Sequence, residues 1–363
     1  MRVLRVSHSG VITAWRERER VLRTLGVDVS LATSRHWNEG GKGVHFSADA
    51  DDFAVPVRTF GRHPNAFVFD PLPLWRLLGT NWDVLDIHEE PCSLATAELL
   101  VLRWLRGRRI PFLLYSAQNI PKRYPWPFRW IERWALHRAA GVYVCNVAAG
   151  EILRSKGLKG EMREIPLGVD TSRFSPSEHP PPDGTLRIGY VGRLETHKGV
   201  ASLIEAVSAL EGATLEIIGA GPEAEGLQSL TRTLGLTDTV TFRGFAEQRD
   251  LPELYRSFDV VVVPSLALPG WLEQFCRVAV EAMATGIPVV ASDTGALPEV
   301  VGDGGLLFAP GNVDALRDVL RRLRDEPGLW QKLRQAALDQ APPFAWSAVA
   351  DAHNRLYEDV VTR

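Results

Sequence analysis

The sequence predicts an α/β protein with two Rossmann-like, doubly wound domains that face a central cleft. Short β-rich runs alternate with amphipathic stretches along the whole chain, which favours parallel sheets built from strand–helix–strand units. The length of 363 residues suits two domains better than one. A proline-rich stretch at 177–184 separates two such series. Ligands of such sheets bind at the carboxyl ends of the strands, so the chemistry is expected in loops at those ends.

The first series spans 1–170 and is expected to form an N-terminal domain. Its strand candidates are short runs rich in β-branched and aliphatic residues. They lie at 2–7, 27–32, 84–88, 112–116 and 142–145. Helical periodicity fills the intervals between them. It is found at 14–25, 93–105 and 128–139.

A linker ends the first series, because Pro180, Pro181 and Pro182 cannot continue a helix or a strand. The second series spans 171–344 and is expected to form a C-terminal domain. Its strand candidates lie at 186–191, 214–218, 239–242, 260–263, 288–291 and 306–308. Its helix candidates lie at 200–210, 223–234, 251–257, 275–285, 313–324 and 329–338, and a last amphipathic stretch follows at 347–361.

Composition favours a cytoplasmic protein. Cys92, Cys145 and Cys276 lie far apart without metal-ligand spacing, which argues against a disulfide framework and a metal site. Charge interrupts the first residues too early for a signal peptide, and no run approaches the roughly 20 apolar residues of a membrane span. Nothing in the pattern predicts a nucleic acid partner.

Charge is distributed unevenly. Residues 1–170 hold 24 Lys and Arg against 18 Asp and Glu, a net charge of +6, whereas 171–363 hold 17 against 26, a net charge of −9. A basic half suits an anionic partner such as a membrane surface or a phosphorylated acceptor. Solvated surface charge is the alternative.

A strand-to-helix turn in the second half carries two cations. Gly192 allows a sharp turn, and Arg193 and Lys198 follow before the next predicted helix. A guanidinium and an ammonium at a helix start can clamp a diphosphate and stabilise charge on a departing nucleotide. The alternative is a surface loop with two ordinary basic residues.

Two carboxylates, Glu273 and Glu281, lie around the start of another predicted helix. On one ideal helix, positions eight apart would stand about 12 Å apart, which suits two parts of one sugar nucleotide better than a shared metal ion. Glu281 could accept hydrogen bonds from ribose hydroxyls, and Glu273 from those of the donor sugar. Alternatively, Glu273 caps its helix and Glu281 is a surface carboxylate.

A dinucleotide fingerprint is weakly matched at Gly219-Ala-Gly-Pro222, after a predicted strand. Pro222 lies in the loop that would wrap a pyrophosphate, and no acidic residue ends a strand about 20 residues later. An oxidoreductase is therefore the weaker interpretation.

Polar residues follow three strands of the first half and are candidates for acceptor binding. They are His8 and Ser9, then His88, Glu89 and Glu90, then Ser116, Gln118 and Asn119. Gly10, next to the first group, is expected to face the donor phosphates. Helix caps and loop contacts are the alternative role for each of these residues.

Arginine and tryptophan alternate through 103–134, in Arg103-Trp-Leu-Arg-Gly-Arg-Arg109 and Lys122-Arg-Tyr-Pro-Trp-Pro-Phe-Arg-Trp-Ile-Glu-Arg-Trp134. Such a segment suits peripheral contact with an anionic membrane at its inner face. The aromatic residues could instead belong to the core of a helix packed on the sheet.

In this order, the motifs of the second half resemble those of the retaining glycosyltransferases of family 4, which have the GT-B fold. The motifs are Val191-Gly-Arg-Leu with Lys198-Gly, Gly219-Ala-Gly-Pro, Val240-Thr-Phe-Arg-Gly-Phe, Pro264-Ser, Glu273-x7-Glu281 with Ala282-Met-Ala-x-Gly-x-Pro-Val-Val, and Pro298-Glu-Val-Val. The resemblance covers nearly the whole chain and is strongest over 186–310. It implies that the last helix, within 345–363, crosses back to the N-terminal domain.

The resemblance also assigns roles. It implies that Arg193 and Lys198 bind the donor diphosphate. It implies that Glu281 binds the ribose and that Glu273 binds the transferred sugar. The leaving phosphate would take the proton of the acceptor, so that no separate nucleophile is required.

The chain departs from the family pattern around the sugar. Many members have Glu-Gly-Phe-Gly where this chain has Glu273-Gln274-Phe275-Cys276, and these side chains should narrow the pocket. The resemblance places the loop from Arg243 to Phe245 by the base. The histidine that often follows an N-domain strand is absent from Tyr115-Ser-Ala-Gln-Asn, and the usual Gly-Gly loop after the first strand is reduced to Ser9-Gly10.

The sequence therefore predicts a retaining, metal-independent hexosyltransferase with Arg193, Lys198 and Glu273 as catalytic residues. The donor would be a nucleotide-diphosphate sugar, preferably a UDP-sugar, with a GDP-sugar as the alternative, and no further cofactor is expected. The acceptor would be a hydroxyl of a lipid-linked sugar, a polysaccharide or a small molecule. This activity would serve polysaccharide, glycolipid or glycoconjugate synthesis. A nucleotide-sugar epimerase and a non-catalytic sugar-nucleotide-binding protein are the alternatives.

Overall fold

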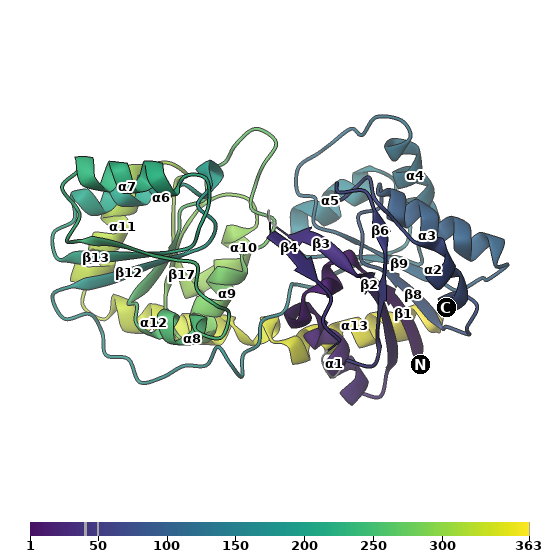
Figure 1. Cartoon of the computed structure of the whole chain (residues 1–363). Coiled ribbons are helices and arrows are strands. Elements are labelled where there is room, and N and C mark those ends of the chain that lie inside the picture. Colours follow the sequence, from purple (N-terminus) through teal and green to yellow (C-terminus); the bar gives the residue numbers. More distant parts are fainter. Residues whose placement is uncertain (40–41, 49–50, 363) are drawn as a thin grey trace. The chain divides into compact units, whose positions relative to one another are not determined.

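The computed structural model describes residues 1–39, 42–48 and 51–362, and the chain divides into two compact units (Figure 1). Unit 1 combines Met1–Pro166 with Trp346–Arg363, and unit 2 is Leu167–Ala345. Each unit contains one large sheet whose neighbouring strands are all parallel. The predicted α/β class is therefore confirmed.

The sheet of unit 1 has seven strands. In spatial order they are β11 (Glu161–Glu164), β10 (Gly141–Val144), β9 (Phe112–Ser116), β8 (Val84–Ile87), β1 (Arg2–Val6), β2 (Asp28–Ser34) and β5 (Ala54–Val57). The strand order reverses beside β1, and ligands of open α/β sheets bind at the carboxyl ends of strands near such a point. β5 and β11 were not predicted, because a proline interrupts the first and three of the four residues of the second are charged.

Two antiparallel hairpins extend unit 1 beyond the sheet. They are β3 (His36–Glu39) with β4 (Lys42–His45), and β6 (Thr59–Phe60) with β7 (Val68–Phe69). Both follow strands of the sheet, the first after β2 and the second after β5. They therefore lie near the carboxyl ends of those two strands.

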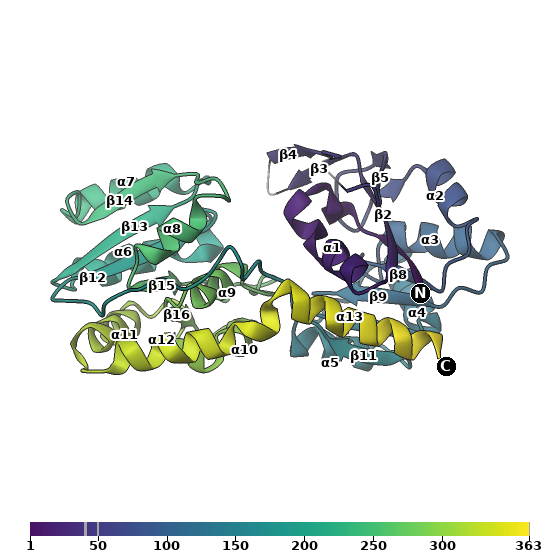
Figure 2. The same ribbon diagram turned by 90° about the horizontal axis from the view of Figure 1, so that it is seen from below.

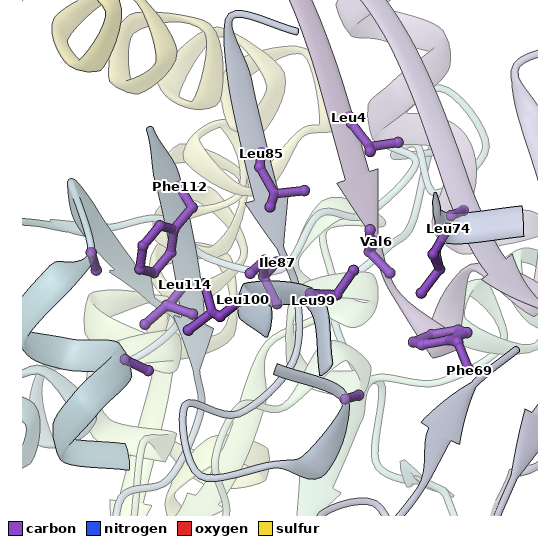
Figure 3. Packing of buried hydrophobic residues seen from close by; sticks show 14 of the residues in the cluster. Leu4, Val6, Phe69, Leu74, Leu85, Ile87, Leu99, Leu100, Phe112 and Leu114 are labelled. Carbon is purple, nitrogen blue, oxygen red and sulfur yellow. The ribbon is translucent and has the colours of Figure 1, made fainter. Parts of the chain in front are cut away.

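Alternate side chains of the unit 1 strands enter two different cores, as a pleated strand requires. Leu4, Leu85 and Leu114 pack under one layer of helices, and Figure 3 shows this core. The helices of that layer are α2 (Pro71–Leu77), α3 (Leu94–Leu105), α4 (Phe128–Arg138) and α5 (Val147–Ser155). Val3 and Val84 point to the opposite face, where α1 (Glu17–Thr24) and α13 (Trp346–Val361) cover them.

The last helix, α13, belongs to unit 1 and runs beside α1 (Figure 2). Its Tyr357 hydroxyl donates a hydrogen bond to the Asp86 carboxylate at 2.6 Å, and the Arg18 guanidinium donates to the same carboxylate at 3.2 Å. His353 lies 2.7 Å from Arg18 through its Nε2 atom. The prediction that the final helix packs on the N-terminal domain is confirmed.

The sheet of unit 2 has six strands. In spatial order they are β14 (Val240–Gly244), β13 (Ala213–Ile218), β12 (Leu186–Val191), β15 (Val260–Val263), β16 (Val289–Ser292) and β17 (Gly305–Phe308). Its helices are α6 (Val200–Ser208), α7 (Ala224–Thr233), α8 (Leu251–Arg256), α9 (Arg277–Ala284), α10 (Leu297–Val301), α11 (Val313–Asp325) and α12 (Leu329–Gln340). All six predicted strands of this half exist, and their order reverses between β12 and β15.

Within the described ranges, no helix has the length and apolar character that crossing a lipid bilayer would demand. Cys92, Cys145 and Cys276 are buried free thiols. The same residues include no cluster of histidine, cysteine or carboxylate side chains arranged to hold a metal ion.

Candidate functional site

Glycines bring two loops of unit 2 into contact beyond the ends of β12 and β13. A side chain at Gly219 would overlap the carbonyl oxygen of Gly192, and one at Gly221 would overlap that of Leu194. Gly192 and Gly219 also have positive φ, at 156° and 152°. The glycine pattern that resembled a dinucleotide fingerprint therefore serves close packing behind the Gly192 turn.

Lys198 and Glu273 meet in unit 2. Gly199 adopts the left-handed conformation, with φ 67°, and a side chain there would overlap the Pro264 carbonyl. This packing brings the Lys198 turn against the end of β15. The Lys198 ammonium then donates to Glu273 Oε2 at 2.8 Å, and the Ser265 hydroxyl donates to the same oxygen at 2.9 Å.

A neighbouring loop fixes the backbone of Glu273. The Ala296 N–H donates to the Glu273 carbonyl at 2.9 Å. Gly295, with φ 58°, allows this approach, because any side chain there would overlap the Glu273 backbone. The Glu273 carboxylate is thus held by a cation, a hydroxyl and its own backbone, as a side chain that orients a ligand must be.

Arg193 lies at the edge of this cluster. Its half-exposed guanidinium forms an ion pair with Glu195, which also lies 3.3 Å from His197 Nε2. The His197 ring packs 4.0 Å from the Trp271 ring, and Lys198 Nζ lies 4.9 Å from the same indole. Burial and the Lys198 charge lower the pKa of His197, so its ring is neutral at pH 7.

Glu281 is buried on α9. Its Oε2 accepts a hydrogen bond from the Tyr255 hydroxyl at 2.9 Å, and Arg277 lies 3.4 Å from its Oε1. Burial raises the pKa of Glu281. The predicted spacing of about 12 Å assumed that Glu273 and Glu281 lie on one helix. They do not, because Cys276 is extended (φ −121°, ψ 92°) and α9 begins at Arg277, after Glu273.

The Cys276 thiol lies among Glu273, Glu281 and Lys198. Burial and the two carboxylates together raise its pKa to about 12, against the opposing effect of the ammonium. The thiol is therefore protonated at neutral pH. The four side chains predicted to hold a diphosphate, a sugar and a ribose thus gather in one part of unit 2.

The other predicted donor residues surround this cluster at different depths. Arg243 forms an ion pair with Glu216 at the surface, and Phe245 follows it with 68% of its side chain exposed. Gln274 is exposed, whereas Phe275 is buried with its ring 5.8 Å from Phe344. Phe275 therefore packs the core, and Gln274 and Phe245 face solvent.

In unit 1, His8 and Glu89 form a pair across β1 and β8. The His8 N–H donates to Glu89 Oε1 at 2.7 Å, and His8 Nδ1 lies 2.7 Å from Oε2. Ser9 bonds to Ser7 at 2.8 Å. Gly10 is buried in the following turn, where an added side chain would press against Leu31 and Thr33.

His88 belongs to a buried chain of polar groups. Its Nδ1 lies 2.8 Å from the Tyr143 hydroxyl, which donates to Asp86 at 2.8 Å. The His88 ring stacks on Tyr115 at 3.9 Å. Burial and the nearby Arg18 charge lower the pKa of His88 well below its usual value, so His88 is neutral at pH 7.

The remaining first-half candidates brace the end of β9. Glu90 accepts hydrogen bonds from the Ser116 hydroxyl at 2.7 Å and from the Ala117 N–H at 2.9 Å. Burial raises the pKa of Glu90. Gln118 donates to the Ile120 carbonyl at 3.1 Å, and Asn119 is buried beside it. Each partner lies within unit 1.

Sequence reasoning assigned no role to four partners in the unit 2 cluster: Ser265, Tyr255, Arg277 and His197. Arg277 stands four positions before Glu281, so the i,i+4 rule for helices could have found it. Ser265 comes two residues after the end of a predicted strand, where ligand-binding residues gather. Tyr255 comes from α8, and no local pattern links it to Glu281.

The basic-aromatic segment 103–134 divides into two parts. Arg103, Arg106 and Arg108 donate to backbone carbonyls of Ile110, Trp75 and Gly79, so they brace unit 1 itself. By contrast, Trp126 and Trp130 are 84% and 59% exposed. Arg129 and Arg133 lie on the same exposed face, and within the described residues their side chains make no hydrogen bond or ion pair.

Models of two protein families match the chain. Residues 172–340 match "Glycosyl transferases group 1", and residues 9–173 match "Glycosyltransferase Family 4". Together the two matches extend over nearly the whole chain.

Curated relatives include a 2-deoxystreptamine glucosyltransferase from Streptomyces kanamyceticus, 32% identical over 54% of this chain and 54% of the relative. An MMP alpha-(1->4)-mannosyltransferase from Mycolicibacterium hassiacum is 34% identical over 61% and 54%. A D-inositol 3-phosphate glycosyltransferase from Corynebacterium jeikeium is 34% identical over 55% and 52%. The chain spans about half the length of these relatives.

Solved structures share the fold. Sucrose-phosphate synthase from Thermosynechococcus elongatus has a TM-score of 0.75 at 20% identity, covering 100% of this chain and 99% of that one. Anabaena HepE, in complex with UDP and glucose, has a TM-score of 0.74 at 20% identity, covering all of both chains. These likenesses confirm the predicted GT-B architecture.

Proposed function

Because the chain belongs to the group 1 glycosyltransferases of family 4, we propose that it transfers a sugar from a nucleotide-diphosphate sugar to a hydroxyl acceptor. Retention at the anomeric carbon follows from the family. Unit 2 holds the donor, and unit 1 offers the polar groups for the acceptor. A hexose on uridine diphosphate is the preferred donor, in keeping with the UDP and glucose held by HepE, which has the same fold.

One observation carries this proposal: Lys198 Nζ lies 2.8 Å from Glu273 Oε2. A cation that binds a phosphate and a carboxylate that accepts sugar hydroxyls are adjacent here. In a sugar nucleotide the diphosphate and the sugar are joined at one anomeric oxygen, so their binding groups must be adjacent too. Arg193 adds a second cation, and buried Glu281 supplies an acceptor for ribose hydroxyls.

The proposed chemistry rests on charge. As the bond between the anomeric carbon and the phosphate oxygen breaks, negative charge grows on the diphosphate, and Arg193 and Lys198 stabilise it. The departing phosphate oxygen takes the proton of the acceptor hydroxyl while that hydroxyl bonds to the same face of the sugar. Glu273, held by Ser265, orients the sugar for this attack. These two cations can supply the charge stabilisation, so we expect turnover without an added divalent metal.

Calorimetric titration tests the donor site. We expect wild-type protein to bind UDP and a UDP-hexose, and a variant with Lys198→Ala to bind both more weakly. Lys332→Ala, an exposed lysine in the same unit, is the matched control. Wild-type protein that binds neither uridine nor guanosine diphosphate compounds would refute the proposed function.

Two alternatives within the same fold have separate outcomes. A nucleotide-sugar epimerase would convert the donor without an acceptor, so chromatography of a donor-only reaction would reveal a second sugar nucleotide. A non-catalytic binding protein would bind the donor tightly and release no UDP with any acceptor in a broad panel. Free UDP that accumulates only with an acceptor supports transfer.

We also propose that unit 1 contacts an anionic membrane surface through a face called here the α4 basic face. It consists of Trp126, Arg129, Trp130, Arg133 and Arg138, which line the same hollow of the surface. Exposed tryptophans favour the headgroup region, and cations favour anionic lipids. The one acidic residue of α4, Glu132, is buried and bound to Lys156 at 2.7 Å, so it does not offset these charges.

Vesicle co-sedimentation tests the α4 basic face. Wild-type protein should bind phosphatidylcholine vesicles that contain phosphatidylglycerol and not those without it. Removing two charges with Arg129→Gln/Arg133→Gln should cost about 2 kcal/mol, roughly a 30-fold loss of affinity. Trp104→Ser, a 72% exposed tryptophan on α3, is the control for Trp126→Ser. Equal binding by all variants would contradict the proposal.

A further inference from the structure

We propose that a pocket in unit 1 binds an anionic group, a phosphate or a carboxylate, carried by the acceptor; the inference rests on the proposed function. The pocket has a volume of about 600 Å³. Its walls include Arg35, Arg58, Arg62, Trp37, Asn38 and Phe60. None of these residues was singled out by sequence reasoning, because they come from two segments that lie about 20 residues apart in the chain.

Strand register explains why two of the arginines converge. β2 and β5 pair in parallel with Ser34 opposite Val57, so Arg35 and Arg58 each follow the last pair. Paired strands lie about 4.8 Å apart, which places the two residues side by side at the carboxyl edge of the sheet. The Arg35 N–H donates to the Val57 carbonyl at 2.7 Å and fixes this arrangement. Arg62 joins them from the β6–β7 hairpin.

Charge in this pocket is not compensated by the described part of the chain. No acidic side chain is among the described residues that line it. Arg35, Arg58 and Arg62 make no side-chain hydrogen bond or ion pair with described residues. The Arg58 guanidinium lies over the Phe60 ring, 5.7 Å from its centre. Arg18, Arg20 and Arg106 of the same unit, by contrast, meet carboxylates or a backbone carbonyl. Three uncompensated guanidinium groups in one hollow favour a phosphate or carboxylate, which they can bind in a bidentate manner.

Trp37 connects this pocket to the acceptor candidates. Its buried indole forms part of the pocket wall, and the same ring lies 4.4 Å from the ring of His8. His8 in turn pairs with Glu89 at the reversal point of the sheet. A hydroxyl acceptor that reaches His8 and Glu89 would therefore extend an anionic substituent past Trp37 toward the arginines. The donor diphosphate has its own cations in unit 2.

Calorimetric titration without donor tests the pocket. The probes are inorganic phosphate, glucose 6-phosphate, glucuronate and, as the uncharged control, glucose. We expect glucose 6-phosphate or glucuronate to bind wild-type protein at least about tenfold more tightly than the variant Arg35→Gln/Arg58→Gln. Whichever of the two binds more tightly identifies phosphate or carboxylate as the preferred group.

A charge-matched control separates this pocket from general attraction of anions. Arg154→Gln/Arg232→Gln removes two exposed arginines elsewhere and should bind the probes as wild type does. The inference is overturned if wild-type protein binds no anionic probe, or if the two double variants lose affinity equally. UDP is titrated into the same proteins, because intact UDP binding with no probe binding would sink this pocket alone, whereas absent UDP binding would sink the proposed function.

Discussion

Asp86 in unit 1 is fully buried and accepts hydrogen bonds from Tyr143, Tyr357 and Arg18. Glu273 in unit 2 is also largely buried, but its cation, Lys198, keeps about a quarter of its side chain exposed. The first carboxylate is enclosed by partners from its own unit. The second forms a pair with an open side that a ligand can reach.

The difference separates structural from functional charge. A buried charge surrounded by permanent partners contributes to the stability and alignment of the unit. A charged side chain that has partners on one side and solvent on the other is available to bind a ligand. Variants at Asp86 should therefore change the free energy of unfolding, and variants of the Lys198–Glu273 pair should change turnover.

The largest expected effect is on stability in unit 1. Asp86→Ala leaves Arg18 with one carboxylate fewer in a buried setting and removes the anchor of Tyr357, so unfolding should become easier by about 3–5 kcal/mol. Urea denaturation followed by circular dichroism measures it. Asp359→Ala breaks an exposed ion pair of α13, the helix that carries Tyr357. It should lower the free energy of unfolding by less than about 1 kcal/mol. Equal losses would remove the distinction between the two settings.

The next effect is on catalysis in unit 2. Lys198→Ala removes a cation that stabilises the developing negative charge. The activation free energy should therefore rise by about 3–4 kcal/mol, which lowers kcat/KM some 10²–10³-fold. UDP release with an acceptor measures the rate. The urea midpoint should stay close to that of Lys332→Ala. A variant that keeps full turnover would contradict the catalytic role of Lys198. A variant that unfolds would show that Lys198, like Asp86, stabilises the fold.

A smaller effect tests the partner of Glu281. Tyr255→Phe removes the hydroxyl that donates to this carboxylate, which should raise the pKa of Glu281 and weaken UDP binding by about 1–2 kcal/mol. Titration with UDP and with uridine diphosphate lacking the ribose 2′-hydroxyl measures the loss. The difference between the two ligands should shrink in the variant. An unchanged difference would show that Glu281 does not contact the ribose.

An effect of similar size concerns pH. Glu98 in unit 1 accepts the Phe69 N–H at 2.8 Å, and burial raises its pKa from 4.5 to about 7. The folded chain then binds more protons than the unfolded chain between these values, so stability falls as pH rises through this window. Because Glu98 is partly exposed, we expect about 1–2 kcal/mol between pH 5 and pH 8. Glu98→Gln should lose this part of the slope in urea denaturation, and an unchanged slope would contradict the assignment.

Local sequence was enough for much of unit 2. All six strands were predicted, because each is a short apolar run bounded by turn residues. Arg193 and Lys198 were singled out because they follow a strand in a glycine turn, and Glu273 because it lies near the start of a predicted helix. The start of α9 was misjudged, since an extended residue at Cys276 delays the helix past the apolar run.

Unit 1 was less accessible to sequence reasoning. His88 and Glu90 were predicted to face an acceptor because they follow a strand. Within unit 1, His88 is hydrogen-bonded to Tyr143, and Glu90 accepts a hydrogen bond from Ser116. The strand β5 was missed, and with it the pairing that brings Arg35 beside Arg58. These relations join positions far apart in the chain.

The sequence alone determined the α/β class, the two alternating series and the two cations of the Gly192 turn, because periodicity and turn chemistry act between near neighbours. Only the tertiary structure decided which charges are enclosed and which remain open. Strand register, the packing of α13 against Asp86 and the contact of Lys198 with Glu273 depend on backbone pairing over long separations, and no local pattern encodes the burial that results.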